Sequence, residues 1–382
     1  MKKFLNRLHF LTRRKIEAVT FLIIFFLVFG FIGYKMGFTN MLNTIMQTSY
    51  SLLIETVLYI MAITVVSGAL GSLLVEFGVV RLIEYFLKPL MKPLYNLPGV
   101  AAIGGIMTFL SDNPAIISLS KDKNFTQFFK KYQLISLTNF GTAFGMGLVV
   151  VIFMMGKGYV AGALIGLLGA IVGSIVSTRL MQKFILKSHP ELNAEEESKG
   201  DESKISFKSE GGVFLRFLNA ILDGGKSGVD VGLAIIPGVL IISTFVMMIT
   251  FGEPEGGYTG GPYEGIGLLP YLANKVNFIF EWLFGFKNPE LLAFPITSLG
   301  AVGAALGLIP RFMAEGLLNG NAIAVFTAMG MCWSGFLSTH TAMLDSLGYR
   351  NLTSKAIIAH TIGGFVAGIA AHLFYLLFSL IA

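Results

Sequence analysis

A run of polar and helix-breaking residues interrupts an apolar stretch of the chain. The stretch reads GGIMTFLSDNPAIISLSKD, and the run is Ser111, Asp112, Asn113 and Pro114. Proline lacks a backbone donor and disfavours helix at the preceding residue, and the other three are typical N-cap residues. One interpretation is therefore a capped helix break. The other is that these side chains line a solute cavity, in which Asp112 binds a cation or a proton.

A second polar break lies in the later part of the chain, within the sequence LIPRFMAEG. Pro310 breaks the helix there. Arg311 and Glu315 are four residues apart, which places them on one face if the helix resumes. They can pair with each other, Arg311 can bind a carboxylate or phosphate of a substrate, or it can reach toward the membrane surface. The sequence leaves these roles open.

The apolar segment after each break contains polar side chains. Thr138 and Asn139 lie in LISLTNFGTAFGMG, and Ser338, Thr339 and His340 lie in MCWSGFLSTHTAMLD. A hydroxyl group in a helix often bonds to the helix backbone, so each one alone carries little weight. The amide of Asn139 needs several partners, which predicts a polar site or a helix contact. An imidazole titrates near neutral pH, which makes His340 a candidate for proton coupling.

Composition indicates a membrane protein, whose apolar segments these polar residues interrupt. The chain has 382 residues, of which 54% are hydrophobic and 13% are charged, and its mean hydropathy is +0.74. A soluble domain has about 25% charged residues, and apolar runs of 18 or more residues indicate spans. We predict seven spans, at residues 16–34, 52–77, 133–155, 158–181, 229–251, 322–344 and 354–381.

Several functional classes are not supported by the sequence. The single cysteine, Cys332, excludes an internal disulfide. The sequence has no cysteine–histidine metal spacing, no phosphate-binding loop and no nucleophile–base motif. We therefore expect that the chain is not an enzyme. We also expect no protein-bound cofactor or metal and no nucleic-acid partner.

Charge predicts the topology of the two interrupted stretches, residues 98–120 and 291–318. Residues 98–110 reach only about two thirds of a ~30 Å hydrocarbon core, and both stretches are predicted to be re-entrant hairpins. A full crossing by residues 291–318 is the alternative, and it would place the C-terminus inside rather than outside. With residues 98–120 re-entrant, the basic N-terminus, Arg81, KDKNFTQFFKK and RLMQKFILK all lie on one side. Basic loops collect in the cytoplasm. We predict a multi-pass protein of the bacterial cytoplasmic membrane with a cytoplasmic N-terminus.

A weak internal repeat divides the chain. Residues 41–51 match residues 217–227, and a charged cytoplasmic linker separates the two halves. Amphipathic stretches at 81–96 and 213–226 are predicted to lie in the membrane surface. Three crossings per half make the repeat inverted, which is typical of secondary transporters. The predicted units are residues 1–40 (tail and first helix), 41–186 (first repeat), 187–212 (linker) and 213–382 (inverted second repeat).

The predicted architecture is an all-α polytopic membrane protein, an inverted repeat with two re-entrant helical hairpins and interfacial amphipathic helices. Over roughly residues 40–380 it resembles membrane proteins with the nucleoside-recognition or Gate domain. The stretch SDNPAIISLSKD is most similar to an uncharacterised clostridial-type family of that group. The resemblance to concentrative nucleoside transporters is more remote. Their glutamine- and glutamate-bearing signature in the first hairpin is replaced here by Ser-Asp-Asn-Pro.

The resemblance implies a substrate site between the hairpin tips and the polar helices that follow them. The implied residues are Ser111, Asp112, Asn113, Thr138, Asn139, Arg311, Glu315, Ser338 and Thr339, with Asp112 and His340 for ion coupling.

The predicted function is secondary active transport of a small polar solute, coupled to Na⁺ or H⁺ by alternating access. A nucleoside or nucleobase is favoured, and amino acids or other organic ions are alternatives. A further alternative is a non-transporting Gate-domain protein with a sporulation or envelope-assembly role. The expected partners are the small-molecule substrate and the lipid bilayer, and the interfacial helices leave a homo-oligomer open.

Overall fold

The computed structural model describes residues 13–194 and 211–381, and these two ranges are helical without any strand. Seven of their helices are long and apolar enough to cross a membrane, and each overlaps one predicted span. This confirms the all-α polytopic fold. The seven are Arg14–Met36, Phe38–Glu76, Lys131–Gly156, Val160–Ser188, Val213–Thr250, Gly320–Ser346 and Arg350–Ser379.

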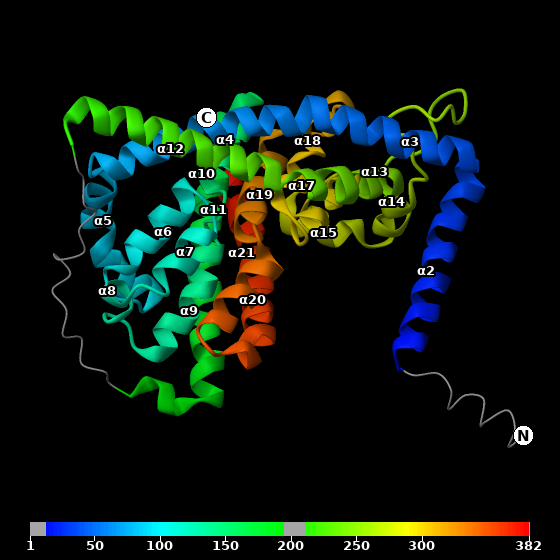
Figure 1. Ribbon diagram of the computed structural model, residues 1–382. Coiled ribbons are helices and arrows are strands. Elements are labelled where there is room, and N and C mark those ends of the chain that lie inside the picture. Colours follow the sequence, from blue (N-terminus) through cyan, green and yellow to red (C-terminus); the bar gives the residue numbers. More distant parts are fainter. Residues whose placement is uncertain (1–12, 195–210, 382) are drawn as a thin grey trace, which may run out of the picture.

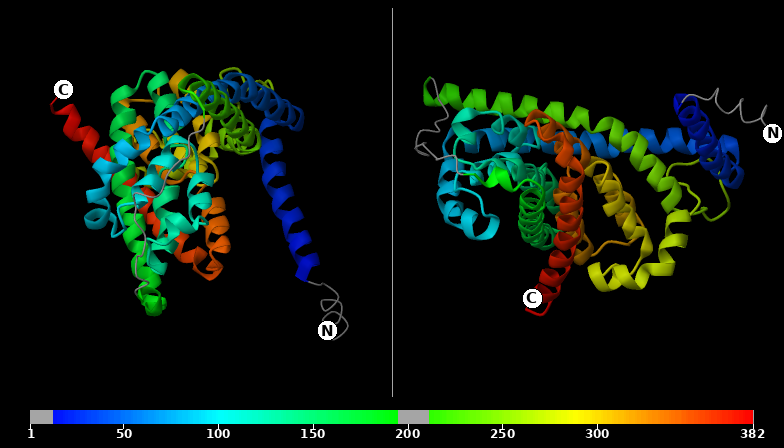
Figure 2. Two further views of the ribbon diagram at one scale, coloured as in Figure 1. Left: turned by 60° about the vertical axis from the view of Figure 1, so that its left-hand side comes forward. Right: turned by 90° about the horizontal axis from the view of Figure 1, so that it is seen from below.

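A pair of long helical segments lies across one side of the molecule (Figure 1). The first comprises α3 (Phe38–Ser51), the π-helix η1 (Leu52–Val57) and α4 (Leu58–Glu76), and the second is α12 (Val213–Ala234). Figure 2 shows the two running side by side. A Cβ atom at Gly228 would lie 2.2 Å from the carbonyl oxygen of Thr64, so only glycine permits this approach. Thr64 Oγ1 also donates to the Gly228 carbonyl at 2.7 Å.

The N-terminal helix α2 (Arg13–Met36) stands apart from the rest of the structure (Figures 1 and 2). It descends from the outer end of α3, and most of its large apolar side chains are exposed. Only residues near its C-terminal end, such as Ile32 and Met36, are buried. An exposed apolar helix of this length fits a lipid environment.

A bundle of three helices forms the opposite part of the molecule: α11 (Val160–Ser188), α19 (Gly320–Cys332) and α21 (Thr353–Ser379). Small residues allow close contact here too, because a Cβ atom at Gly173 would lie 2.5 Å from the Gly363 carbonyl. Close packing of small residues is the usual means of helix association in lipid. The short 3₁₀-helix η8 (Arg350–Leu352) precedes α21.

The stretch with the first polar break folds as a helical hairpin. Helices α6 (Ala101–Leu110) and α7 (Pro114–Leu119) are joined by residues 111–113, hereafter tip 1. A Cβ atom at Gly104 would lie 2.8 Å from Ile116 Cδ1, so the two arms are in contact. The short α8 (Lys123–Thr126) follows.

Before this hairpin lie α5 (Val79–Leu90) and the π-helix η2 (Met91–Tyr95), where a surface helix was predicted. Part of its charged stripe faces the protein: Glu84 is buried and pairs with Arg81 at 2.8 Å. Tyr85 and Phe86 are exposed on the outside. The helix therefore presents Tyr85 and Phe86 outward and holds the Arg81–Glu84 pair against the protein, whereas Lys88 and Lys92 are exposed.

The second half differs in detail from the prediction. Residues 213–226 are not a separate surface helix, because α12 continues unbroken to Ala234. Short helices over residues 268–284, which were not predicted, precede the second hairpin, and Tyr271, Phe278 and Trp282 on them are exposed. The helices after α12 are η5 (Gly238–Ser243), α13 (Thr244–Thr250), α14 (Leu268–Ala273), η6 (Asn274–Val276), α15 (Asn277–Phe284), η7 (Pro289–Leu292), α16 (Ala293–Ser298), α17 (Val302–Leu306) and α18 (Ile309–Ala314).

The second hairpin does not turn at Pro310, where its tip was expected. The helix is interrupted there, since α17 ends at Leu306 and α18 begins at Ile309, and Pro310 occupies the first turn of α18, where the missing donor costs nothing. The break equivalent to tip 1 is at residues 299–301, between α16 and α17, hereafter tip 2. Its sequence, Leu-Gly-Ala, carries no charge.

The two apolar segments that follow the hairpins are broken in the middle, although continuous helices were predicted. The first divides into α9 (Lys131–Thr142) and α10 (Gly147–Gly156), and the second into α19 and α20 (Phe336–Ser346). Met146 and Gly335 have positive φ angles of 52° and 60° at these breaks. Left-handed backbone is costly for methionine and easy for glycine.

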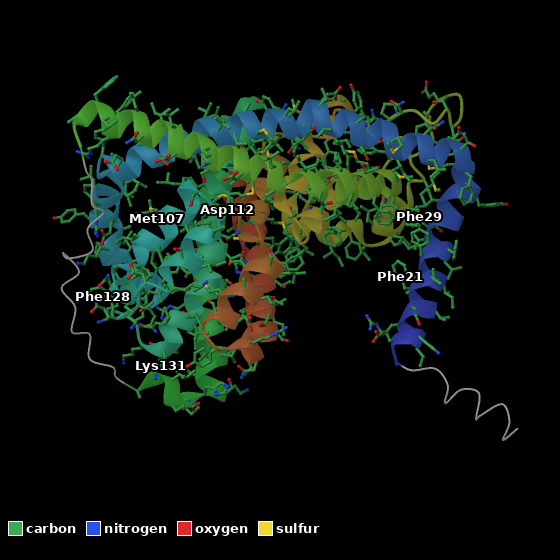
Figure 3. All side chains as sticks on the ribbon, in the orientation of Figure 1. Phe21, Phe29, Met107, Asp112, Phe128 and Lys131 are labelled. Carbon is green, nitrogen blue, oxygen red and sulfur yellow. The ribbon has the colours of Figure 1, made fainter. Side chains whose placement is uncertain are left out.

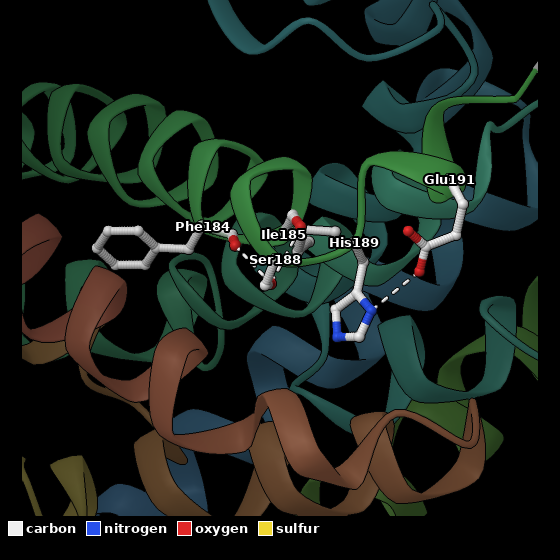
Figure 4. A network of polar contacts seen from close by, with 5 residues as sticks. All are labelled: Phe184, Ile185, Ser188, His189 and Glu191. Atoms are coloured by element: carbon white, nitrogen blue, oxygen red, sulfur yellow. Dashed lines mark hydrogen bonds and ion pairs between the residues drawn. The ribbon is translucent and has the colours of Figure 1, made fainter.

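Helix α11 ends in a small polar network (Figure 4). The Ser188 hydroxyl donates to the carbonyls of Phe184 at 2.9 Å and Ile185 at 3.1 Å, and His189 Nδ1 contacts Glu191 Oε1 at 3.0 Å. The 3₁₀-helix η3 (Pro190–Asn193) follows. Most of the predicted linker, residues 195–210, and the basic tail at residues 1–12 lie outside the described residues.

Candidate solute cavity

A cavity of about 730 Å³ lies where tip 1, both helix breaks, tip 2 and α12 meet. This size suits a small organic ligand. Polar groups converge on it from segments far apart in the sequence. The lining includes Asp112 and Asn113 of tip 1, Pro114 of α7, Met146, Ser334 and Gly335 of the breaks, Ser338 and Thr339 of α20, Gly300 and Ala301 of tip 2, and Ser227 and Asp230 of α12.

Asn113 connects tip 1 to both breaks. Its side chain is 5% exposed, and Nδ2 donates to the Ser334 carbonyl at 3.1 Å. A Cβ atom at Gly145 or at Gly335 would lie 2.4 Å from that same nitrogen. The amide is therefore held between the two broken helices. Its Oδ1 atom is buried and has no hydrogen bond to any described residue.

Asp112 is the acidic group of the tip, and Figure 3 shows it near α12. The backbone N–H groups of Asn113 and Met146 face its carboxylate. Met146 precedes α10, whose positive N-terminal end favours an anion. Even so, Asp112 Oδ1 is buried without a hydrogen bond from the described part of the chain. A buried carboxylate oxygen in this position calls for a cation, a proton or water.

Side chains also satisfy the carbonyl groups that the second break exposes. Asn113 serves the Ser334 carbonyl, and His360 Nε2–H donates to the Cys332 carbonyl. Because His360 donates through Nε2, its Nδ1 accepts from the Ser177 hydroxyl at 2.9 Å in the neutral ring. The break thus has partners from tip 1 and α21, which explains why it can persist in an apolar setting.

Asn139 lies outside the cavity, in the contact between three helices. Its Nδ2 donates to Ser177 Oγ and to the Ala356 carbonyl, both at 3.0 Å. It is fully buried, as is Thr138. Neither lines any cavity found among the described residues. The arrangement corresponds to the helix-contact role that the sequence had left open.

His340 is also fully buried and lines none of the cavities found in residues 13–194 and 211–381. Its Nδ1 contacts the Phe336 carbonyl one turn earlier, and its ring lies 4.6 Å from that of His360. Nε2 has no hydrogen-bond partner among the described atoms. The two imidazoles lie together beneath the second break.

Arg311 and Glu315 lie in a separate cavity of about 470 Å³. They form an ion pair with each other, and the guanidinium also lies 5.1 Å from the Phe251 ring centroid and 5.6 Å from that of Tyr263. Tip 2, rather than this pair, faces Asp112 across the main cavity. The geometry corresponds to the mutual pairing that their spacing allowed.

The comparisons with known proteins concern the fold. No protein-family model matches the sequence, and no curated protein matches it significantly. Three solved structures of variants of CNTnw, a concentrative nucleoside transporter, are similar. One variant in the state called intermediate 1 has 14% identity and a TM-score of 0.51, covering 82% of this chain and 75% of CNTnw.

Two CNTnw variants in outward-facing states have TM-scores of 0.52 and 0.53, with 15% and 12% identity. Each alignment covers 84% of this chain and 76% of CNTnw. The chain has the fold of these transporters. At this level of identity the likeness concerns the fold alone.

Sequence reasoning found part of the cavity. Of the predicted residues, Asp112, Asn113, Ser338 and Thr339 line it, and Ser111 lines a neighbouring cavity of about 350 Å³. The acidic and hydroxyl groups of α12 were missed. A signal for them exists, because Asp223, Ser227 and Asp230 follow at spacings of four and three residues and so share one helix face.

Proposed function

We propose that the chain is a secondary active transporter of a small polar solute, with a nucleoside or nucleobase as the leading class. Transport is coupled to Na⁺ or H⁺ and proceeds by alternating access. The observation that carries the proposal is the cavity in which the Oδ1 atoms of Asp112 and Asn113 are buried without partners among the described residues. Broken helices that meet around a cavity are typical of transporter binding sites.

The proposed roles follow from position. Asp112 and Asn113 hold the coupling cation or proton and a polar group of the solute. Ser338 and Thr339 offer hydroxyl groups from α20. Tip 2 brings backbone close to the solute through Gly300. The pair α4–α12, in which backbones touch, is the static frame against which the hairpins move.

The proposed setting is the bacterial cytoplasmic membrane, with the N-terminus in the cytoplasm. The start of α2, Lys131 and the end of α11 lie toward one side of the molecule, and the end of α21 lies toward the other (Figures 1 and 3). Basic residues on one side support this orientation. Membership of the Gate-domain group and a homo-oligomeric assembly belong to the same proposal.

Ligand binding and uptake test the function. Purified protein is screened for thermal stabilisation by nucleosides, nucleobases and amino acids, in Na⁺ and in K⁺. A ligand at 100 times its Kd adds about 2.7 kcal/mol of stability. Hits are then tested for gradient-driven uptake in proteoliposomes.

We expect a nucleoside to stabilise the protein in a cation-dependent manner and to accumulate. Accumulation of another class of solute would support transport and change the proposed substrate. Absence of accumulation for every stabilising ligand would overturn transport and favour the assembly role.

A further inference from the structure

Helix α12 presents a polar stripe to the cavities. The smaller cavity, of about 350 Å³, and the main cavity both have α12 as a wall. Spacings of three and four residues keep the polar positions on one face of the helix. The stripe consists of Arg216, Asn219, Asp223, Ser227 and Asp230.

The two cavities adjoin along this stripe. Ser227 and Val231 line both of them. On the opposite wall, Ser111 lines the smaller cavity and its neighbour Asp112 lines the main one. Tip 1 therefore separates the two spaces, and the α12 stripe runs past it.

The charge along the stripe is mostly negative. Asp223 lines the smaller cavity and Asp230 the main one, and neither has an ion pair with another described residue. Arg216, at the far end of the smaller cavity, pairs with Glu76 at 2.6 Å. Lys226 is exposed on the adjoining face of α12 and lines neither cavity in the described structure.

A second observation indicates that the polar stripe of α12 leads to a ligand site. Asn113, which is 5% exposed, lines the main cavity together with Asp112, and the Oδ1 atoms of both residues are buried without a partner in the described chain. Oxygen atoms are the ligands that hard cations and ammonium groups prefer. Acidic groups in a cleft with low-dielectric walls raise the local concentration of cations.

We propose that Asp223, Ser227 and Asp230, the acidic track, form a cation-selective route from the smaller cavity to tip 1. The species that moves along it is a positive charge, either Na⁺ or the ammonium group of a solute. The Arg216–Glu76 pair closes the far end of the route. The inference rests on the proposed function only in assigning transport to the site at which the route ends.

Charged thiol reagents test the sign of this route without knowledge of the substrate. Cys332 is the only cysteine and is buried, so Cys332→Ala gives a thiol-free background in which Ser227→Cys is introduced. The purified protein is treated with the cationic methanethiosulfonate MTSET and the anionic MTSES. Each rate is normalised to that of a small free thiol. We expect the cationic reagent to be favoured by about tenfold or more.

Neutral variants supply the control. Asp223→Asn together with Asp230→Asn should bring the normalised ratio to within about twofold of unity. Asp345→Asn removes the same charge from a position that lines neither cavity and should leave the ratio unchanged. Circular dichroism and melting temperature establish that each variant is folded. Equal rates for the two reagents, or no reaction with either in folded protein, would overturn the proposal.

Protection experiments distinguish the two sources of positive charge. Slower MTSET labelling in Na⁺ than in N-methyl-D-glucamine assigns the track to the coupling ion. If tetramethylammonium or methylammonium slows MTSET labelling and Na⁺ does not, the track is assigned to the solute. Charge-selective labelling without uptake of any solute would sink the proposed function and keep the track. Uptake with equal labelling rates would do the reverse.

Discussion

Tip 1 and tip 2 line the same cavity with opposite kinds of surface. Tip 1 brings Asp112 and Asn113, whereas tip 2 brings Gly300 and Ala301 without a charged or amide side chain. Tip 1 is also tightly wedged, because the Asn113 amide fills the space beside Gly335. Around Gly300 the nearest atoms leave ordinary contact distances of 3.5 Å. The two tips therefore differ in chemistry: one hairpin brings an acid and an amide to the cavity, and the other brings small apolar residues.

The largest effect should come from comparing Gly335, which lies against tip 1, with Gly300 of tip 2. Gly335→Ala puts a methyl group 2.4 Å from Asn113 Nδ2 and forces alanine into a φ of 60°. We expect it to lower the free energy of unfolding by about 3 kcal/mol. The matched change Gly300→Ala should cost less than about 0.5 kcal/mol. Denaturation in detergent measures both, and equal costs would erase the contrast between the tips.

Next in size is the chemistry of tip 1. Asp112→Asn keeps the shape of the side chain and removes its charge. We expect cation-driven uptake to fall about 30-fold, or about 2 kcal/mol. Unfolding stability should hold or rise, because the substitution removes the negative charge of a carboxylate whose buried Oδ1 has no partner in the described chain.

Asp345→Asn, outside the cavity, is the control for this change. Uptake unaffected by Asp112→Asn would remove the functional distinction between the tips.

A smaller effect should distinguish residues that line the cavity from Asn139, which lies in the packing between helices. Asn139→Ala removes two hydrogen bonds that join α9 to α11 and α21. We expect a loss of about 1.5 kcal/mol in stability and a ligand Kd within about threefold of the original. Thermal unfolding and a binding isotherm check the two values. A lost affinity with intact stability would instead move Asn139 into the site.

The smallest effect concerns the loop between α13 and α14. Burial raises the pKa of Glu264, and hydrogen bonds from Thr259, Gly261 and Gly260 lower it; together the bonds prevail, so its pKa lies below the usual value. A lowered folded-state pKa gives stability that is present above the unfolded value, about 4.3, and lost as pH falls through the folded one.

Protection factors for amide exchange in this loop, which correct for the intrinsic pH dependence of exchange, should therefore fall about threefold on acidification below pH 4. In Glu264→Gln this fall should disappear. A loop equally protected at pH 6 and pH 3 would show that the carboxylate does not hold it.

The sequence located the spans and tip 1 for simple reasons. Hydropathy marks long helices, and the Ser-Asp-Asn-Pro run interrupts one because it is polar and ends in a proline, which disfavours helix at the preceding residue. Tip 2 was misplaced because Leu299, Gly300 and Ala301 are apolar, while the break beside Pro310 separates α17 from α18 and is not the turn of the hairpin. The breaks at Met146 and Gly335 were missed because glycine-rich stretches are common in membrane helices.

The sequence by itself determined that the chain is all-α and membrane-spanning, and that an acid and an amide interrupt one apolar stretch. These properties are local, since they depend on residues close in the chain. Only the tertiary structure decided which polar groups meet. Asp112 faces the cavity that Asp230 also lines, whereas Asn139 turns into helix packing. That outcome depends on which helices lie side by side, and contacts between distant segments set it.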